Sequence, residues 1–268
     1  MKILGIESSC DDTSISIIDN NKNIIANETI SQNQIHKDYN GVVPELAARN
    51  HVLYIDKILK RILKKQQLRI TDIGLIAATV GPGLVGGLLV GLTFAKTLSQ
   101  VNRIPFIGVN HLEGHALTAR LANKVEYPFL LLLVSGGHSN FYFISDINDY
   151  KFLGGTLDDA LGEAFDKVAN ILGLDFPGGP QLELLAMKGD YKKVSLPKPL
   201  INVKSLDMSF SGLKTAAFNC NNEIDKNNIS RCDLAASFQK SVADVLCKKI
   251  SLAIDISNKE FSNYKNVV

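Results

Sequence analysis

The stretch "PFLLLLVSGGHSNFYFISD", residues 128–146, decides the fold. Two apolar runs flank a turn of small residues, which is typical of two antiparallel strands joined by a hairpin. Residues 2–19 show the same order, because the runs "KILGI" and "SISIID" flank the polar turn "ESSCDDT". A third run follows each pair, "NIIANETI" in the first half and "YKFLGGTL" in the second. Each half of the chain is therefore predicted to begin with a three-stranded meander.

The remaining elements extend this pattern into an α/β fold with a mixed sheet in each half. After the first meander we expect a helix over 43–65, a buried strand over 73–80, a glycine-rich helix over 81–100 and another buried strand over 104–110. In the second half, helical patterns cover 158–172 and 235–254, and "KNVV" at 265–268 looks like the opening of a buried strand. The element order predicts two lobes of like topology, residues 1–125 and 126–268.

The bulk properties indicate a protein of the cytoplasm. Hydrophobic residues make up 46% of the chain and charged residues 21%, which is ordinary for a globular protein. The N-terminus reaches Glu7 and Asp11 too soon for a signal peptide, and the most apolar stretch, 84–95, is too short to span a bilayer. The four cysteines form no C-x-x-C pair, so we expect a reducing compartment and no membrane.

A basic helix face raises the question of nucleic acid. The stretch 54–69 places Ile55, Ile58, Leu59, Ile62 and Leu63 on one helical stripe and puts lysines and an arginine largely opposite. With a net charge of only +2, a solvated basic face is favoured over an RNA contact.

The two hairpin turns are candidate ligand loops. In "VSGGHSN", Gly136 and Gly137 would let the backbone approach a ligand and cradle an anion, although a hairpin turn that needs positive φ is equally compatible. The first-lobe turn contains Cys10, which could be a nucleophile. No histidine lies near it in sequence, so a small buried thiol is favoured.

Two further segments of the second half could bind a polar ligand. "FPGGPQLE" places two glycines before a helical pattern, where N–H groups favour anions, although a plain turn explains it nearly as well. In "LGEAFDKVANILG", Glu163 and Asp166 stand three apart on one helical face and could bind a ribose. A solvated face is the simpler interpretation of either carboxylate.

"VNHLEGHALTARL", residues 109–121, contains two histidines at i and i+4, similar to the H-E-x-x-H helix of zinc proteases. On a helix, His111 and His115 are about 40° apart, so both rings can reach one ion. Glu113 points elsewhere and cannot be the general base of a protease. With Asn110 as N-cap, Glu113 instead fits a capping box. A metal site and a surface pair both remain open.

Taken together, the motifs resemble one family over essentially the whole chain. They occur in the order "LGIESSCDDTS", "GVVPELAARNH", "GPGLVGGLLVG", "NHLEGHA", "LLVSGGHS", "LGEAFDKVA", "PGGP" and "DMSFSGLKTA". This set is similar to that of the TsaD family of tRNA N6-adenosine threonylcarbamoyltransferases. The resemblance implies an actin-like ATPase fold of two duplicated lobes, as in sugar kinases and Hsp70.

The resemblance also implies an activity. The family transfers the threonylcarbamoyl group from threonylcarbamoyl-adenylate to N6 of the adenosine 3′ of the anticodon, in tRNAs that read codons beginning with A. By the same resemblance, His111 and His115 bind one divalent metal ion, iron or zinc, and Asp11 is the catalytic residue. The matching substrate positions are Val134, Ser135, Gly136, Gly137, His138, Asp166 and Gly179. The implied partners are tRNA, a TsaB-like paralogue of the first lobe and a TsaE-like ATPase.

Two departures from the family matter. Asp12 stands where many members have glutamate. The family also continues beyond the position of Val268, with a segment that ends in asparagine and another whose aspartate completes the metal site. The sequence therefore leads us to expect a second lobe incomplete at its C-terminus, and a chain that is inactive or nearly so in threonylcarbamoyl transfer and marginally stable. Two alternatives stay open, a truncated paralogue that acts only as a partner-binding module and an actin-like kinase or ATPase.

Overall fold

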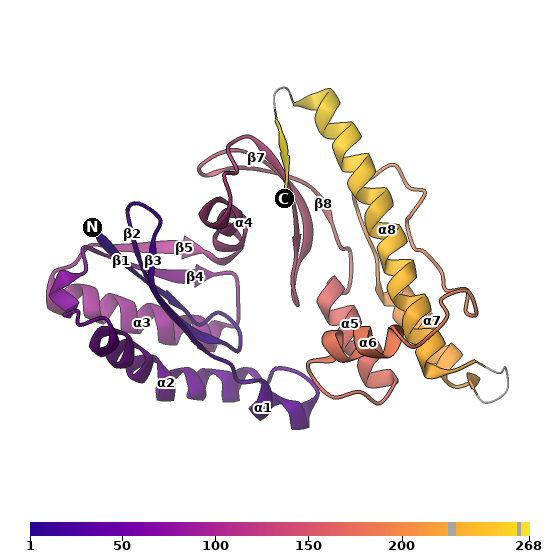
Figure 1. The fold of residues 1–268 in the computed structure, drawn as a ribbon, viewed down its shortest axis with the longest axis horizontal. Helices are drawn as coiled ribbons and strands as arrows, with labels where there is room; N and C mark the ends of the chain where they lie inside the picture. Colours follow the sequence, from indigo (N-terminus) through magenta and orange to yellow (C-terminus); the bar gives the residue numbers. More distant parts are fainter. Residues whose placement is uncertain (225–228, 262–263) are drawn as a thin grey trace. The chain divides into compact units, whose positions relative to one another are not determined.

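The computed structural model describes residues 1–224, 229–261 and 264–268, and the chain divides into two compact units, Met1–Leu121 and Ala122–Val268 (Figure 1). Each unit is an α/β structure built on its own sheet. Among the described residues, no helix combines the length and the apolarity that crossing a bilayer requires.

The first unit contains a five-stranded mixed sheet in the order β3-β2-β1-β4-β5. Its strands are β1 (Lys2–Glu7), β2 (Thr13–Asp19), β3 (Ile24–Ile30), β4 (Leu75–Gly81) and β5 (Phe106–Asn110). Strand β2 is antiparallel to both β1 and β3, while β4 is parallel to both β1 and β5. The predicted meander at the edge of a mixed sheet is therefore confirmed.

Two long helices cover this sheet. The helical elements of the unit are α1 (Asn33–His36), η1 (Lys37–Tyr39), α2 (Pro44–Lys65), η2 (Ile70–Asp72), α3 (Val85–Asn102) and α4 (His111–Ala122). Pro44 starts α2, where a missing N–H costs nothing. Ile55, Ile58, Leu59 and Ile62 of the predicted stripe are buried and pack with the sheet residues. Figure 1 shows α2 and α3 side by side against the strands.

The expectation of a buried strand over 104–110 is wrong. Strand β5 lies at the edge of the sheet and pairs only with β4, and Ile107 is 51% exposed. An apolar run predicts a strand, but its position in the sheet depends on pairing partners that the local sequence does not specify.

The second unit repeats the topology of the first. Its sheet has the order β8-β7-β6-β9, formed by β6 (Phe129–Val134), β7 (Ser139–Asp146), β8 (Asp149–Gly155) and β9 (Asn266–Val267). Strand β9 pairs in parallel with β6, as β4 does with β1, and places Val267 opposite Leu130. The duplication is thus confirmed, and "KNVV" does form a strand. The expectation that this strand is buried is wrong, because β9 lies at the edge of the described sheet and Val267 is 50% exposed.

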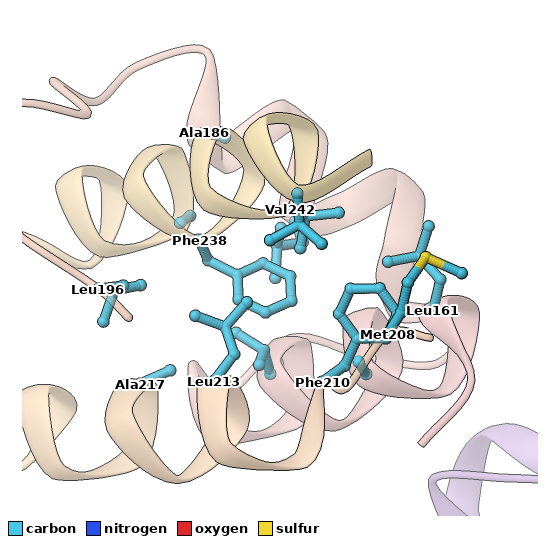
Figure 2. Close-up of a cluster of buried hydrophobic side chains, with 14 of the residues drawn as sticks. Leu161, Ala186, Leu196, Met208, Phe210, Leu213, Ala217, Phe238 and Val242 are labelled. Carbon is cyan, nitrogen blue, oxygen red and sulfur yellow. The ribbon is translucent and has the colours of Figure 1, made fainter. Parts of the chain in front are cut away.

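A helical layer supplies the core of the second unit. It consists of α5 (Leu161–Ile171), α6 (Gly178–Ala186), α7 (Ser211–Asn221) and α8 (Arg231–Glu260). Figure 2 shows Phe238 of α8 next to Leu213 of α7, in a cluster that extends to Leu161 of α5. Helix α7 was not predicted from the sequence. It buries only Leu213 and Ala217, so its hydrophobic pattern is too short to stand out.

Candidate functional site

The two histidines lie one turn apart at the beginning of α4. Their Nε2 atoms are 3.2 Å apart, and the rings meet edge to face with centroids 4.5 Å apart. Asn110, the last residue of β5, accepts hydrogen bonds from the N–H groups of Leu112 (2.9 Å) and Glu113 (3.3 Å). The predicted helix and its Asn110 N-cap are therefore confirmed, and the cap fixes where the pair begins.

A carboxylate from β1 lies behind the first histidine. Nδ1 of His111 is 3.4 Å from Glu7 Oε2 and 3.1 Å from Ser9 Oγ. Glu7 also accepts hydrogen bonds from the N–H of Ser9 and the hydroxyl of Thr79. Burial raises the pKa of Glu7, but the hydrogen bonds from His111, Ser9 and Thr79 outweigh it and lower the pKa to about 2. An ionised carboxylate only accepts, so it favours the proton of His111 on Nδ1 and a free lone pair on Nε2.

The positions of His111 and His115 fit two ligands of one divalent metal ion. Two imidazole nitrogens bound to one ion at about 2.1 Å lie roughly 3.0–3.4 Å apart. The separation of 3.2 Å between the Nε2 atoms of His111 and His115 falls in this range. A carboxylate on the far nitrogen of a ligating histidine is the usual supporting contact. Within the described residues, no group of three His, Cys, Asp or Glu side chains could hold an ion by itself.

The turn between β1 and β2, which contains Asp11, is held by a buried histidine of α2. His51 Nδ1 lies 2.8 Å from Thr13 Oγ1, and its Nε2 lies 3.1 Å from the carbonyl oxygen of Cys10. Burial lowers the pKa of His51 despite the raising effect of the nearby carboxylates. The ring is therefore neutral at pH 7 and can donate to the carbonyl and accept from the hydroxyl. His51 thus fixes both ends of the segment that surrounds Asp11.

The beginning of α3 packs directly on the turn between β1 and β2. Ser8 Oγ donates to the carbonyl of Gly87 at 2.9 Å, and a Cβ on Gly87 would lie 2.4 Å from the carbonyl oxygen of Ser8. Leu84 N donates to the carbonyl of Ser9 at 2.7 Å. Only glycine fits at position 87, because the backbone of α3 approaches the backbone of the turn too closely for a side chain. The turn is rigid because α2 and α3 hold it from separate directions.

The pKa values of Cys10 and Asp12, which belong to the same turn, are both raised. Cys10 is exposed, so the expectation of a buried thiol is wrong. Partial desolvation and the charge of Asp11 raise the pKa of Cys10 to about 12, so the thiol stays protonated and is a poor nucleophile. Desolvation likewise raises the pKa of Asp12, opposed by a hydrogen bond with Ser31 and reinforced by the charge of Asp11.

The turn between β6 and β7 closes through Ser135 and His138. Ser135 N donates to the carbonyl of His138 at 2.8 Å, and His138 N donates to Ser135 Oγ at 3.0 Å. Neither Gly136 nor Gly137 has positive φ, and a Cβ on either would meet nothing within 4 Å. Turn geometry therefore does not explain the two glycines. The open space above Gly136 and Gly137 is compatible with the interpretation of this turn as a ligand loop.

Helix α5 begins directly against this turn. Leu161 N donates to Ser139 Oγ at 2.8 Å, and Gly162 N donates to the carbonyl of Ser135 at 3.3 Å. A Cβ on Gly162 would lie 2.8 Å from the Cα of Gly136. The positive end of the α5 dipole is therefore adjacent to the glycine turn, which favours a negatively charged ligand there.

Asp166 connects α5 to α6. It lies one turn after Gly162, and its Oδ1 accepts a hydrogen bond from Gly178 N at 2.8 Å. A Cβ on Gly178 would lie 2.3 Å from the Cβ of Ala169, whereas one on Gly179 would meet nothing within 4 Å. Contacts thus run from the turn at 135–138 through α5 to Asp166 and the open Gly179. Glu163 is not part of this series and forms an ion pair with Lys167 at 2.7 Å.

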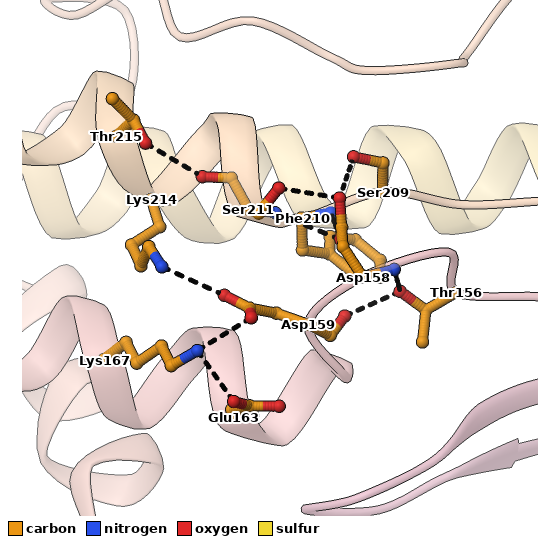
Figure 3. A network of polar contacts seen from close by, with 10 residues as sticks. All are labelled: Thr156, Asp158, Asp159, Glu163, Lys167, Ser209, Phe210, Ser211, Lys214 and Thr215. Carbon is orange, nitrogen blue, oxygen red and sulfur yellow. Dashed lines mark hydrogen bonds and ion pairs between the residues drawn. The ribbon is translucent and has the colours of Figure 1, made fainter.

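A network that was not anticipated fixes the start of α7 beside α5 (Figure 3). Asp158 accepts hydrogen bonds from Phe210 N (2.8 Å), Ser211 N (3.2 Å), Ser211 Oγ (2.7 Å) and Ser209 Oγ (2.5 Å). Burial raises the pKa of Asp158, but these hydrogen bonds lower it to about 2. The neighbouring Asp159 forms ion pairs with Lys167 at 2.7 Å and Lys214 at 3.4 Å.

The structure distributes the predicted site residues between the two units. Asp11, His111 and His115 belong to the first unit, and residues 134–138, Asp166 and Gly179 belong to the second. Both turns join adjacent antiparallel strands, as predicted. That they line one cleft stays a prediction. Sequence reasoning did not single out Glu7 or His51, although both lie inside the motifs that carry the family resemblance.

Known proteins similar to this chain agree on a single family. The family model described as "TsaD: tRNA N6-adenosine threonylcarbamoyltransferase" matches residues 23–262. Relatives named tRNA N6-adenosine threonylcarbamoyltransferase from Rickettsia rickettsii (strain Sheila Smith) and Rickettsia bellii (strain OSU 85-389) are each 52% identical over 271 and 269 residues. Each alignment covers 100% of this chain and 79% of the relative.

A solved structure supports the fold. Component A of (R)-2-hydroxyglutaryl-CoA dehydratase from Acidaminococcus fermentans is similar with a TM-score of 0.52 and 16% identity. The match covers 100% of this chain and 81% of that chain. At this identity the likeness shows the fold alone, which is the actin-like α/β fold expected from the sequence.

Proposed function

The chain belongs to the TsaD family of tRNA N6-adenosine threonylcarbamoyltransferases, and from this premise we propose how its residues transfer a threonylcarbamoyl group to N6 of an adenosine in tRNA. The family match over residues 23–262 carries the activity. The geometry of the two turns supports the division of labour described below, in which the second unit binds the donor and the first supplies the reaction centre.

The donor is threonylcarbamoyl-adenylate, and the second unit binds it. The open backbone at Gly136 and Gly137, next to the N-terminus of α5, suits the phosphate or carboxylate of this donor. Val134, Ser135 and His138 frame this turn. Asp166 and Gly179 bind hydroxyl groups of the same molecule. Asp166 is already oriented by Gly178 N, and Gly179 leaves room for close approach.

The first unit directs the chemical step. The N6 amine of adenosine attacks the carbonyl carbon of the threonylcarbamoyl group, and a C–N bond forms. The bond between that carbon and the phosphate oxygen breaks, and AMP leaves with the electron pair. The amine loses one proton, which Asp11 accepts as general base. The turn that presents Asp11 is held by His51 and Gly87, so the carboxylate is preorganised for this transfer.

His111 and His115 would hold a divalent ion, iron or zinc, through their Nε2 atoms. Such an ion supplies Lewis-acid stabilisation of negative charge on the carbonyl oxygen. The residues of the chain prepare this site in advance. Glu7 and Ser9 hold the His111 ring, and Asn110 fixes the helix start.

The substrate tRNA is the macromolecular partner, and we place the reaction in the cytoplasm. We further propose a TsaB-like paralogue and a TsaE-like ATPase as protein partners. Apolar side chains on the solvent side of α2 and α3 support a helical partner surface: Val52 and Leu53 on α2, and Val85 and Leu89 on α3, are all more than half exposed.

A transfer assay with preformed labelled threonylcarbamoyl-adenylate, tRNA and the two partner proteins tests this function. We expect label in tRNA at a low level with the wild-type chain, and a further loss of at least a hundredfold in Asp11→Asn. Gly137→Ala should fold normally, because a Cβ there meets nothing, yet should lower donor affinity. Gly41→Ala, another loop glycine with open surroundings, is the matched control. No transfer by the wild type would refute the function, and equal donor affinity in both glycine variants would refute the donor site.

A further inference from the structure

The loop "KGDYKK", residues 188–193, follows α6 and is clamped to the beginning of α8. A Cβ on Gly189 would lie 2.0 Å from the carbonyl oxygen of Cys232, so only glycine allows this approach. Asp190 N donates to Asp233 Oδ1 at 2.8 Å. Surface loops are usually mobile, whereas this one is fixed by its backbone.

Asp233 is the buried anchor of this loop. Its side chain closes a capping box with Ser230 at the start of α8, and its Oδ2 lies 3.3 Å from Lys193 Nζ. The hydrogen bond from Asp190 N and those from Ser230 hold the pKa of Asp233 well below its usual range. The anchor is therefore charged at any pH near neutrality, and one carboxylate fixes both the helix start and the loop.

The clamped loop presents an exposed aromatic ring with two ammonium groups near it. Tyr191 is 47% exposed, and its carbonyl oxygen accepts a hydrogen bond from Ser237 Oγ at 3.1 Å. Lys192 Nζ lies 6.0 Å and Lys240 Nζ 5.9 Å from the centre of the ring. An exposed ring with cations beside it is a common arrangement for binding an unpaired nucleotide, whose base stacks while its phosphates meet the cations.

Only some of the lysines of this surface form ion pairs within the described part of the protein. Lys193 is paired with Asp233, and Lys240 is paired with Asp244 at 2.5 Å. Lys188 and Lys192 are exposed, and neither has an ion-pair partner in the described part of the chain. On the basic face of α2, Lys60 and Arg61 are likewise paired with carboxylates, but among the described residues that face has no exposed ring flanked by lysines from a second element.

We propose that the loop at residues 188–193, together with Lys240, binds the substrate tRNA. The inference rests on the proposed function and adds a location for the nucleic acid, with Lys188 and Lys192 on phosphates and Tyr191 against a base or ribose. An acidic protein surface would also suit this loop, and the transfer assay below distinguishes it from tRNA. The loop follows the C-terminal end of α6, a helix of nine residues whose second residue is the open Gly179. It therefore begins about 14 Å along the chain direction of α6 from Gly179, a proposed donor-binding residue, which is a distance that an anticodon stem-loop spans.

The test measures tRNA binding by the full chain at several salt concentrations. We expect Lys188→Gln combined with Lys192→Gln to weaken binding several-fold and to reduce the slope of log K against log salt by about 2, roughly 1 for each phosphate contact. Tyr191→Ala should weaken binding about tenfold with little change of slope, and Tyr191→Phe should restore it. Lys151→Gln combined with Lys259→Gln is the matched control. It also removes two positive charges, near the opposite end of α8, where Lys151 pairs with Glu260.

A transfer assay distinguishes this site from the donor site. The loop variants should raise KM for tRNA and leave kcat and the KM for threonylcarbamoyl-adenylate unchanged. If the double lysine variant of the loop and the double lysine control show the same affinity and the same salt slope, the loop does not bind tRNA. The loop variants could instead change only the binding of a partner protein, while the wild-type chain still transfers the group. In that case the loop binds a protein partner, so the tRNA site is refuted and the proposed function stands. If the wild-type chain binds no tRNA, the proposed function falls with it.

Discussion

Glu7 Oε2 lies 3.4 Å from Nδ1 of His111, although the two residues are 104 positions apart in the chain. The contact connects the end of β1 to the first residue of α4, so it ties the turn that contains Asp11 to the histidine pair. It also selects the tautomer that leaves Nε2 of His111 available, 3.2 Å from the same atom of His115. The first unit thus joins its proposed base and its proposed metal ligands through one carboxylate.

Glu7→Gln should weaken metal binding by about 10–100-fold, because the neutral amide is a poorer acceptor for the His111 proton. Titration of the purified chain with Zn²⁺ or Co²⁺ measures the change without an activity assay. Glu45→Gln is the control, since Glu45 forms only an exposed ion pair with Arg49 on α2. Equal affinity in both variants would show that Glu7 does not support the pair. Wild-type affinity in His111→Ala would remove the metal site altogether.

His51→Leu should lower the free energy of unfolding by about 2–4 kcal/mol, because it leaves the hydroxyl of Thr13 and the carbonyl of Cys10 without their buried partner. The pH dependence has a definite sign. The pKa of His51 is lowered from 6.5 in the folded state, so the unfolded chain binds more protons below that value. Wild-type stability should therefore fall as the pH drops below 6.5, and the variant should lack this component. Urea unfolding at pH 7.5 and 5.5 measures both, and identical pH dependence would contradict the prediction.

The sequence could predict those elements whose signals are local. The meanders and their turns follow from alternating apolar runs around small or polar residues. "KNVV" was enough to predict that β9 exists, because β-branched residues favour strands, but it did not predict the exposed edge position. The edge position of β5 could not be predicted, since it depends on which strands pair. Helix α7 was missed because it buries only two side chains.

The candidate site, too, could be predicted only in part from the sequence. The spacing of His111 and His115 indicated a shared helix face, and the structure places their Nε2 atoms together. Glu7 and His51 act through contacts 104 and 38 positions away in the sequence. No periodicity encodes such contacts. In the sequence, Glu7 looks like the start of a polar turn, and His51 looks like one polar position on an amphipathic helix.

Asp158→Asn should destabilise the second unit by about 1 kcal/mol at neutral pH, because the carboxylate caps the N-terminus of α7. The folded-state pKa of Asp158 is about 2, against 3.8 in the unfolded chain. Its contribution is therefore complete above about pH 4 and is lost as the pH falls toward 2. Chemical unfolding between pH 5 and 2 should show a flatter decline for the variant. The control is Asp149→Asn, an exposed carboxyl at the start of β8, and the same flattening in the control would refute the assignment.

Lys249→Met should cost about 2–4 kcal/mol of stability. Lys249 is fully buried in α8, and its Nζ donates to the carbonyl oxygens of Ser205 (2.6 Å) and Val203 (3.1 Å), in the segment that leads to α7. Methionine fills the space but leaves both carbonyls without a donor. Lys248→Met, at the exposed neighbouring position of the same helix, should change stability by less than about 0.5 kcal/mol.

The titration of Lys249 gives a second measurement of the same contact. Burial lowers its pKa from 10.5, with the charge of Asp207 opposing the shift, so in the window just below pH 10.5 the unfolded chain binds the extra proton. Wild-type stability should then gain a rising component as the pH increases through that window, and Lys249→Met should lack it, while Lys248→Met should keep it. Urea unfolding at pH 7 and 9.5 compares the three proteins. If Lys249→Met is as stable as Lys248→Met at both pH values, the lysine does not hold the segment that positions α7, and the two carbonyls must find other donors.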